Sequence, residues 1–282
     1  MKLLVTGGSG AVGRDICPEL AKSHDVKIFD MGKSDGATEY IQGDIMSPGD
    51  VNAAMKNIDV AIHLVGIWRA PATDRDIMEV NVYGLLNVLE AAVANGVKRV
   101  CMASSIGAMG FSGLQTKVLP PAYLPVDEKH PCRPDGMYGV SKLMGEELCQ
   151  RYTRRYGLST ICLRPPWVLT GDMKLKKGSA KLFAKPDDGM KDLWSYIDAR
   201  DVARAFALAV EIENISHEAF LISAKTHCSK FDWMDLVKTF FPETRTINKD
   251  SLLRNGRNAL FDTSKARTTL GFEPQFAIDD FI

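Results

Sequence analysis

The stretch Thr6-Gly-Gly-Ser-Gly-Ala-Val-Gly13 (TGGSGAVG) decides the fold of this chain. It follows the apolar run Lys2–Thr6, which is typical of a buried strand, and it precedes a helical pattern. Gly7, Gly10 and Gly13 are spaced as in a tight turn that binds a pyrophosphate. Glycine is needed there where the backbone angles exclude other residues, where the backbone approaches the pyrophosphate, and where the helix packs closely on the strand. The same stretch also satisfies the looser G-x-G-x-x-G pattern. Strand, turn and helix together predict a dinucleotide site with its phosphates at the helix N-terminus.

Short apolar runs alternate with amphipathic, helix-length segments over the first half of the chain. The helical spacing is clearest over Glu79–Val93, where Val82, Leu85 and Leu89 share one face. This alternation predicts a parallel sheet with helices on both faces. With the glycine turn after the first strand, the predicted fold is an α/β Rossmann-type doubly wound parallel sheet. The predicted strands after the first are Val26–Asp30, Asp59–His63, Arg99–Ala103 and Thr160–Leu163.

The strand and helix pattern loosens after Leu163, which indicates a small second lobe. Residues 164–189 are rich in Pro, Gly and Lys, as loops are. A strand over Ser195–Asp198 and a helix over Ala199–Ile212 are predicted to return to the core. The predicted division is a cofactor-binding core over 1–163 and 195–212, and a C-terminal substrate-binding lobe over 164–194 and 213–282, with helices over Lys230–Phe241 and Thr263–Leu270.

Composition and charge narrow the function classes. The chain has 282 residues, of which 45% are hydrophobic and 25% charged, as in ordinary globular proteins. Its 35 Lys and Arg residues balance 35 Asp and Glu residues, so its charge favours neither a nucleic acid nor an anionic membrane as a partner. No apolar run approaches the roughly 20 residues of a membrane span, and the N-terminal run is too short for a signal peptide. We expect a cytoplasmic protein.

The cysteine pattern argues against a metal site. The six cysteines form no C-x-x-C pair and do not cluster with the five histidines; they lie at 17, 101, 132, 149, 162 and 228. Cysteines scattered in this way predict reduced, mostly buried thiols and no bound metal.

Asp30 ends the second predicted strand, about 20 residues after the glycine turn. A carboxylate at this position accepts hydrogen bonds from the adenosine ribose hydroxyls and repels a 2′-phosphate. Because Met31 and Gly32 follow it, with no arginine, the sequence favours NAD over NADP. Lys33 is the feature that points toward NADP. The structural alternative is a solvated acid at a strand end.

Tyr138 and Lys142 lie four residues apart in the segment DGMYGVSKLMGEEL. A free tyrosine has a pKa of about 10, too high for a general base near neutrality. A cation four residues on, on the same helix face, stabilises the phenolate. Ser104 and Ser105 follow a core strand, so their hydroxyls are expected at the sheet edge where ligands bind. The pattern predicts a proton acceptor beside a nicotinamide; the alternative is an exposed tyrosine at a helix start.

These residues resemble the extended short-chain dehydrogenase/reductase family, the NAD-dependent epimerases and dehydratases. The resemblance covers roughly residues 1–210 well and the tail only loosely. The family motifs recur in order as TGGSGAVG, Asp30, Gly43-Asp44-Ile45, His63-Leu64-Val65-Gly66, Asn81-Val82-Tyr83-Gly84, Ala103-Ser104-Ser105, Tyr138-Gly-Val-Ser-Lys142, Leu163-Arg164-Pro165, Tyr196-Ile-Asp198 and Asp201-Val202-Ala203.

The resemblance implies a role for each matching position. Ser105 would hydrogen-bond the reacting oxygen, Tyr138 would exchange the proton, and Lys142 would bind the nicotinamide ribose and lower the pKa of the tyrosine. Asn81 would touch the cofactor, unless it makes local backbone bonds at a helix start. Asp44 and Ile45 would hold the adenine, and Leu64, Val65 and Gly66 would line the nicotinamide side. The remaining implied cofactor contacts are Gly7, Gly10, Ala11, Val12, Gly13, Asp30, Ser104, Pro165 and Pro166.

The substrate is less clearly indicated. In the nucleotide-sugar epimerases, an asparagine three residues beyond the arginine grips the substrate diphosphate; here that position holds Trp167, which argues against a nucleotide sugar. Uronate dehydrogenases, a compact branch of the family, look similar around CRPDGMYGVSK, but they carry Asn-His where this chain has Ile106 and Gly107. Lys176, in the basic loop Lys174–Lys177, is a candidate for receiving an anionic substrate group. Further candidates for the substrate pocket are Trp68, Arg69, Ser105, Phe111 and Trp167.

Three functions are carried forward. The first is an NAD-dependent oxidoreductase that oxidises a hydroxyl of a small sugar or sugar acid. The second is a nucleotide-sugar epimerase or dehydratase that retains its NAD. The third is a cofactor-sensing protein without catalysis, which the tyrosine–lysine pair argues against. The family builds a dimer through helices that correspond to Glu79–Val93 and Tyr138–Tyr156, so the resemblance implies a homodimer.

Overall fold

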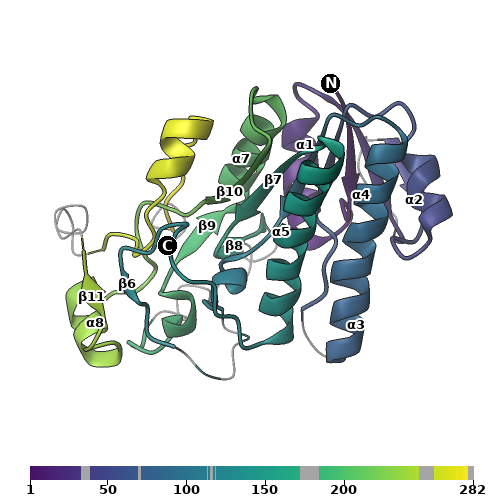
Figure 1. The fold of residues 1–282 in the computed structure, drawn as a ribbon. Coiled ribbons are helices and arrows are strands. Elements are labelled where there is room, and N and C mark those ends of the chain that lie inside the picture. The colour runs from purple at the N-terminus through teal and green to yellow at the C-terminus, as the bar shows by residue number, and fades with distance from the viewer. Residues whose placement is uncertain are drawn as a thin grey trace.

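The structure, a computed structural model, describes residues 1–32, 39–68, 71–112, 114, 117, 119–171, 184–247 and 257–278. Seven parallel strands form its central sheet in the order β10-β7-β5-β4-β1-β2-β3 (Figure 1). The strand order reverses between β1 and β4, and ligands of doubly wound sheets bind outside the carboxyl ends of the strands at this reversal. The predicted fold class is confirmed. The strands are β1 Lys2–Thr6, β2 Asp25–Asp30, β3 Glu39–Gln42, β4 Val60–His63, β5 Arg99–Ala103, β7 Ser159–Arg164 and β10 His217–Leu221.

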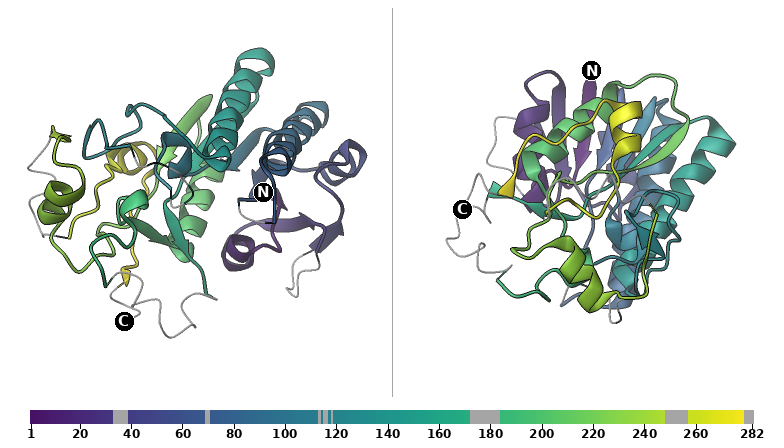
Figure 2. Two further views of the ribbon diagram at one scale, coloured as in Figure 1. Left: turned by 90° about the horizontal axis from the view of Figure 1, so that it is seen from below. Right: turned by 90° about the vertical axis from the view of Figure 1, so that its left-hand side faces the viewer.

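Helices cover both faces of the sheet (Figure 2). Successive side chains of a strand point to opposite faces, so Leu3 and Val5 pack in one layer and Leu4 packs in the other. The first layer is covered by α1 and α7, and the second by α2, α4 and α5. The bounds are α1 Ala11–Leu20, α2 Pro48–Ala54, α4 Gly84–Ala94, α5 Met137–Tyr156 and α7 Ala199–Glu211.

The helix predicted over Glu79–Val93 begins earlier than its apolar pattern. Thr73 and Asp76 form a capping box at the start of α3 Asp74–Met78, which continues through the π-helix η1 Glu79–Tyr83 into α4. By length and composition alone, the 21-residue run Asp74–Ala94, which contains an 18-residue window of mean hydropathy 1.4, could cross a membrane. The expectation that no run approaches that length is therefore wrong for this helix. Half of its apolar window is buried inside the fold, and a core helix meets the same criterion.

A second hydrophobic cluster forms the lobe seen beside the sheet in Figure 1. Trp194 and Tyr196 are fully buried there, with Phe241 packed edge-on against the indole of Trp194. Two small parallel sheets and one helix frame this cluster. They are β8 Trp167–Leu169 with β9 Tyr196–Asp198, β6 Tyr123–Leu124 with β11 Arg245–Thr246, and α8 Trp233–Phe240.

The structure differs from the predicted division at two strands. His217–Leu221 falls in the range predicted for the lobe, but it pairs with β7 as an edge of the central sheet. Only its last two residues are fully buried, so it carries no clear apolar period. The predicted strand Ser195–Asp198 exists as β9, but it pairs with β8 outside the central sheet. The helix after it, α7, does pack on the core, as predicted.

The cysteines have the predicted character. All six thiols are free, and all are buried except that of Cys132, which is half-buried. Within the described ranges, no group of three or more His, Cys, Asp or Glu residues could hold a metal ion.

Candidate active site

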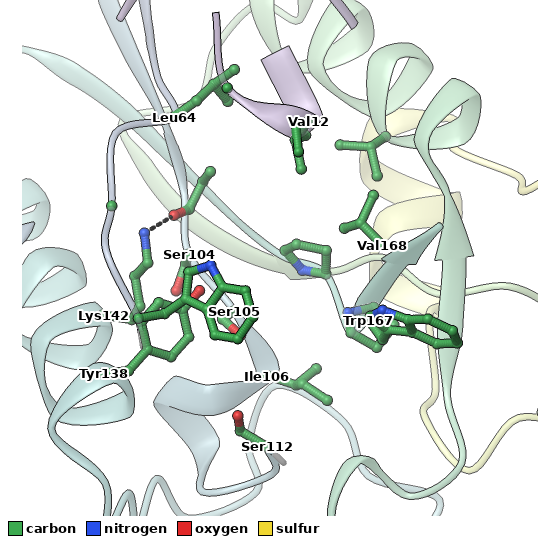
Figure 3. Close-up of a pocket in the computed structure, with 18 of the residues that line it drawn as sticks. Val12, Leu64, Ser104, Ser105, Ile106, Ser112, Tyr138, Lys142, Trp167 and Val168 are labelled. Atoms are coloured by element: carbon green, nitrogen blue, oxygen red, sulfur yellow. Dashed lines mark hydrogen bonds between the residues drawn. The ribbon is translucent and has the colours of Figure 1, made fainter. Parts of the chain in front are cut away.

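A cavity of about 780 Å³ opens at the carboxyl ends of the central strands, where the strand order reverses (Figure 3). This volume lies in the range of small-molecule and cofactor sites. The segments that line the cavity include the turn after β1, the loop after β4, the end of β5, the start of α5, the segment after β7 and the helix α7. Among its lining residues are twelve predicted cofactor contacts, namely Gly7, Gly10, Ala11, Val12, Gly13, Leu64, Gly66, Ser104, Tyr138, Lys142, Pro165 and Pro166.

The glycine turn has the geometry that a bound pyrophosphate requires. Gly7 adopts a φ of 79°, in the left-handed region that favours glycine. A Cβ atom on Gly13 would collide with the backbone of Gly8, so only glycine allows α1 to start this close to the turn. Within the described chain, no side chain caps the first turn of α1 and no acidic residue lies in it. Its backbone N–H groups therefore suit a negatively charged phosphate.

Asp30 lies beside the glycine turn without lining the cavity. Its Oδ2 accepts a hydrogen bond from the backbone N–H of Ser9 at 2.9 Å, and its Oδ1 accepts one from Gly32 at 3.2 Å. The carboxylate thus orders the loop after β2 against the turn. Its predicted contact with the adenosine ribose stays a prediction, and Lys33 lies outside the described residues.

Asp44, Ile45 and Val65 are predicted cofactor residues that do not line the cavity. Asp44 is exposed and its Oδ1 accepts a hydrogen bond from the N–H of Met46 at 2.9 Å. Ile45 is buried against Gly84 at the start of α4, and Val65 packs against the core on the same side of the sheet. Their predicted adenine and nicotinamide contacts stay predictions.

Asn81 lies behind the cavity wall rather than in it. Its Oδ1 accepts the N–H of Ile67 at 2.8 Å, and its Nδ2 donates to the carbonyl of Ile67 at 3.0 Å and to the hydroxyl of Ser141 at 2.9 Å. These bonds span 14 and 60 residues, so they are not the local backbone bonds of the alternative interpretation. Asn81 instead fixes the loop after β4 against α5.

The three predicted catalytic residues meet at one wall of the cavity, on the side opposite Trp167 (Figure 3). Ser105 Oγ accepts the N–H of Gly107 at 2.9 Å, and the hydroxyl of Ser105 is hydrogen-bonded to that of Tyr138. Lys142 is buried; its Nζ donates to the carbonyl of Ala103 at 2.8 Å and lies 5.6 Å from the centre of the Tyr138 ring. A serine, a phenol and an ammonium thus share one face, as proton transfer to or from a hydroxyl requires.

Burial dominates the electrostatics of this wall. It raises the pKa of Tyr138, while the hydrogen bond from Ser105 lowers that pKa. Burial also lowers the pKa of Lys142 to about 8. The pKa of the phenol is therefore raised, and its predicted lowering by Lys142 stays a prediction. His63 lies nearby; burial, helped by the charge of Lys142, lowers its pKa to about 3 and keeps the imidazole neutral.

The substrate end of the cavity is lined mainly by apolar groups. Trp68 and Trp167, both predicted, line it, and Lys142 and Asp192 carry the only charges among its described lining residues. Phe111 does not line the cavity because it packs in the lobe core against Phe261. Arg69 and Lys176 lie outside the described residues. The lining residues missed from the sequence include Ile106, Ser112, Leu114, Val168, Thr170 and Asp192.

No sequence signal marks these missed residues. Ser112 and Leu114 follow the predicted catalytic residue Ser105 in an irregular loop, and Asp192 ends the short 3-10 helix η4 Met190–Asp192. Periodicity finds regular elements, whereas these residues reach the cavity only through the packing of the lobe.

Sequence comparison identifies the family to which the chain is similar. The model of the NAD-dependent epimerase/dehydratase family matches residues 3–223. L-arabinose 1-dehydrogenase (NAD(P)(+)) of Haloferax volcanii is 33% identical over 175 residues, 61% of this chain and 68% of that protein. A putative UDP-glucose 4-epimerase of Methanocaldococcus jannaschii is 30% identical over 262 residues, 84% of this chain and 81% of that protein. Uronate dehydrogenase of Agrobacterium fabrum is 36% identical over 167 residues, 58% of this chain and 60% of that protein.

Solved structures share the fold over almost the whole chain. A mutated uronate dehydrogenase is 25% identical, with a TM-score of 0.69 over 99% of this chain and 83% of that one. A short-chain dehydrogenase/reductase superfamily protein from Agrobacterium tumefaciens, solved with bound NAD, is 23% identical, with a TM-score of 0.73 over 100% of this chain and 94% of that one. Because the family model spans most of the sequence, and because the glycine turn and the Tyr138–Lys142 pair border one cavity, this chain belongs to the NAD-dependent epimerase/dehydratase family.

Proposed function

We propose that the chain is an NAD-dependent dehydrogenase that oxidises a hydroxyl group of a small sugar or sugar acid. One observation carries the proposal: Ser105, Tyr138 and Lys142 line the same cavity as the glycine turn. A cofactor with its phosphates at the N-terminus of α1 and its nicotinamide toward Tyr138 would fit that cavity. The family comparisons support NAD as this cofactor.

Each catalytic residue has a defined role in this proposal. NAD, when bound, supplies the hydride acceptor. Tyr138 takes the proton of the substrate hydroxyl, because its own hydroxyl lies in the cavity and is hydrogen-bonded to Ser105. Ser105 holds the reacting oxygen in line with Tyr138. Lys142 binds the nicotinamide ribose, and its ammonium group favours the phenolate form of Tyr138, which must release its own proton to solvent before it can take the proton of the substrate.

The substrate end supports a small substrate. The indoles of Trp68 and Trp167 line the cavity there, and flat aromatic faces suit the apolar C–H faces of a sugar ring. Trp167 stands where the nucleotide-sugar enzymes carry an amide for the diphosphate, and an indole offers only one donor. The named relatives include an L-arabinose dehydrogenase and uronate dehydrogenases, which supports a monosaccharide or its acid.

Lys176 would distinguish a sugar acid from a neutral sugar. If its ammonium group receives a carboxylate, Lys176→Ala should raise the KM for a uronate about tenfold, as expected for one charged hydrogen bond, and should leave the KM for a neutral aldose unchanged. Lys191→Ala, in the described lobe, is the matched lysine control. An unchanged KM for every acidic substrate would remove Lys176 from the substrate site.

A nucleotide-sugar 4-epimerase or dehydratase with retained NAD is the second candidate. It is favoured by the putative UDP-glucose 4-epimerase, because that alignment spans 84% of this chain. The two functions differ in the fate of the cofactor. A dehydrogenase releases NADH, whereas an epimerase returns the hydride to the sugar within one catalytic cycle.

The experiment that tests the proposal uses purified protein, NAD and a panel of uronates, aldoses and nucleotide sugars. Nicotinamide absorbance reports net reduction, and product analysis reports epimerisation. Reduction of free NAD by a monosaccharide or its acid would support the dehydrogenase. Conversion of a nucleotide sugar to its epimer, without net reduction, would support the second candidate instead.

We further propose a homodimer in a reducing compartment such as the cytoplasm. Large apolar side chains are exposed on η1 and α5, where Tyr83, Met144 and Tyr156 are 55%, 40% and 49% exposed. Such side chains suit a helix-to-helix interface. The six free thiols support a reducing compartment. Light scattering of the wild type and of Met144→Glu would test the dimer, since a buried charge at this position should shift the protein to monomers.

A further inference from the structure

A buried carboxylate lies directly behind the catalytic wall. Glu146 is 6% exposed, and its two partners, Ser104 and Arg164, are 3% and 6% exposed. Glu146 Oε1 accepts the hydroxyl of Ser104 at 2.6 Å and the Nε–H of Arg164 at 2.8 Å. Glu146 Oε2 accepts the Nη2–H of Arg164 at 2.6 Å. One carboxylate thus receives a bidentate arginine and a serine at the same time.

The three residues join three separate segments of the cavity wall. Ser104 immediately precedes the catalytic Ser105 at the end of β5, and Arg164 immediately precedes Pro165 at the end of β7. Glu146 lies one helical turn after Lys142 on α5. The carboxylate therefore links the serine, the lysine helix and the segment beside the cofactor at a single point.

Stability alone is a weak reason for such a pair. Removing two charges from water is costly, and well-packed apolar residues of similar volume are often as stable or more stable. What a bidentate arginine–carboxylate pair adds is a fixed direction and spacing, since its two N–H groups and two oxygens must align. A rigid support of this kind is what a catalytic serine needs, because small displacements of a reacting group reduce the rate strongly.

We propose that Glu146 is a positioning residue of the active site, which acts on Ser105 through Ser104 and on Lys142 through its negative charge. The proposal rests on the dehydrogenase function proposed above. Glu146 makes no contact with the reacting atoms, because it does not line the cavity, whereas its partner Ser104 does. Its effect is to hold the serine oxygen in line with Tyr138 and to keep Lys142 protonated.

The charge of Glu146 opposes the effect of burial on Lys142. Burial lowers the pKa of Lys142 to about 8, while Cys162 on β7 and, to a smaller extent, Glu146 raise it. Lys142 is also faced by His63 on β4, which stays neutral, and by Tyr138 on its own helix. The charged and titratable groups facing Glu146 include Arg164 and Cys162 on β7, Cys132, and His217 on β10. Without the carboxylate, the ammonium group of Lys142 would lose its proton at a lower pH.

Glu146→Gln tests both effects, and Glu147→Gln is the matched control, because Glu147 is the next residue and is exposed. For Glu146→Gln we expect kcat to fall about tenfold or more, with the KM for NAD changed less than about threefold. The alkaline limb of the pH profile should move to lower pH. For Glu147→Gln, kcat and the pH profile should match those of the wild type.

Two further variants keep the test decisive if the unpaired Arg164 prevents Glu146→Gln from folding. Glu146→Gln with Arg164→Met removes both charges and should fold. Its kcat should still be lower than that of the wild type, and the alkaline limb of its pH profile should still lie at lower pH. Ser104→Ala leaves the ion pair intact and removes only the link to the serine; its kcat should fall while the alkaline limb stays in place. Wild-type kcat in Ser104→Ala, or a wild-type pH profile in the double variant, would overturn the proposal.

A measurement without turnover separates this proposal from the proposed function. The ε-amino group of Lys142 is titrated by NMR in lysine-labelled protein with saturating NAD, and Lys142→Met identifies its signal. We expect a lower pKa for Lys142 in Glu146→Gln than in the wild type and in Glu147→Gln. If the pKa of Lys142 falls in this way but the protein oxidises no sugar, only the proposed function is refuted. An unshifted Lys142, together with wild-type kcat in a folded Glu146→Gln, would refute the role of Glu146.

Discussion

The cofactor end and the substrate end of one cavity are built in different ways. The cofactor end is made of backbone: N–H groups at the start of α1, and glycines where a side chain would collide. The substrate end is made of side chains from distant segments, among them Trp68, Trp167 and Asp192. A site made of backbone constrains consecutive residues, so it leaves a motif in the sequence. A site made of scattered side chains leaves none, and its specificity can change without altering the fold.

The largest effect is expected where the two ends meet, at the phenol of Tyr138. Tyr138→Phe removes the proton acceptor and should lower kcat by about 10²–10⁴-fold, the usual contribution of general acid–base catalysis. The dissociation constant of NAD should change little, because the glycine turn is untouched. Steady-state kinetics and NAD titration would check this, with the exposed Tyr156→Phe on the same helix as the control. Full activity in Tyr138→Phe would point to another base.

The next largest effect is expected at the glycine turn. Gly13→Ala places a Cβ against the backbone of Gly8, so the turn must shift away from its phosphate-binding shape. We expect NAD affinity to fall at least about tenfold, corresponding to the loss of one or more charged hydrogen bonds. Calorimetric titration with NAD would measure it. Gly49→Ala on α2 is the matched control, since no atom lies within 4 Å of its added Cβ; unchanged NAD affinity in Gly13→Ala would mean that the cofactor is held elsewhere.

A smaller effect is expected at the substrate end. Trp68 is 45% exposed and lines the cavity, so Trp68→Ala removes one apolar face while leaving Ser105, Tyr138 and Lys142 in place. The KM for the sugar should rise about tenfold, and kcat should change less, because a pocket contact contributes mainly to binding. Initial rates over a range of sugar concentrations would check this. A fall in kcat with unchanged KM would instead assign Trp68 to the chemical step.

The smallest effect is expected on the free energy of unfolding and comes from His63, at the end of β4. The Nδ1 atom of His63 lies 2.8 Å from the hydroxyl of Thr6, and burial lowers the pKa of His63 to about 3. Because the unfolded chain binds this proton at pH values below about 6.5, the stability contributed by neutral His63 is fully present above that pH and is lost as the pH falls toward 3. Between pH 6.5 and pH 5 the loss from this group is about 2 kcal/mol.

Urea unfolding at pH 7 and pH 5 would measure this loss in the wild type and in His63→Asn, whose amide bonds Thr6 but does not titrate. The variant should lose about 2 kcal/mol less than the wild type between these two pH values. Equal losses in both proteins would show that His63 does not govern the acid sensitivity.

The contrast between the two ends also explains how much the sequence predicts. The five strands predicted for residues 1–163 all exist, because each is a short buried apolar run next to a turn or helix signal. Ser105, Tyr138 and Lys142 reach the cavity because strand ends and the first turns of helices have fixed places in a doubly wound sheet. The edge strand β10 was missed since only Phe220 and Leu221 are fully buried in it.

Two kinds of residue escape sequence reasoning. Asp192 reaches the cavity from a short 3-10 helix in the lobe, through contacts that no periodic pattern encodes. Glu146 carries a signal that could have been used, because it follows Lys142 by one helical turn on a face that must be buried. A carboxylate on a buried face requires a partner, and Arg164 is that partner.

The most direct test of the central claim is the number of NADH molecules formed per enzyme molecule, with excess NAD and the sugar that gives the fastest reaction. A dehydrogenase that releases its cofactor should form many equivalents of NADH, and Tyr138→Phe should form almost none in the same time. At most one equivalent of NADH per enzyme, with the sugar recovered as its epimer, would contradict the account.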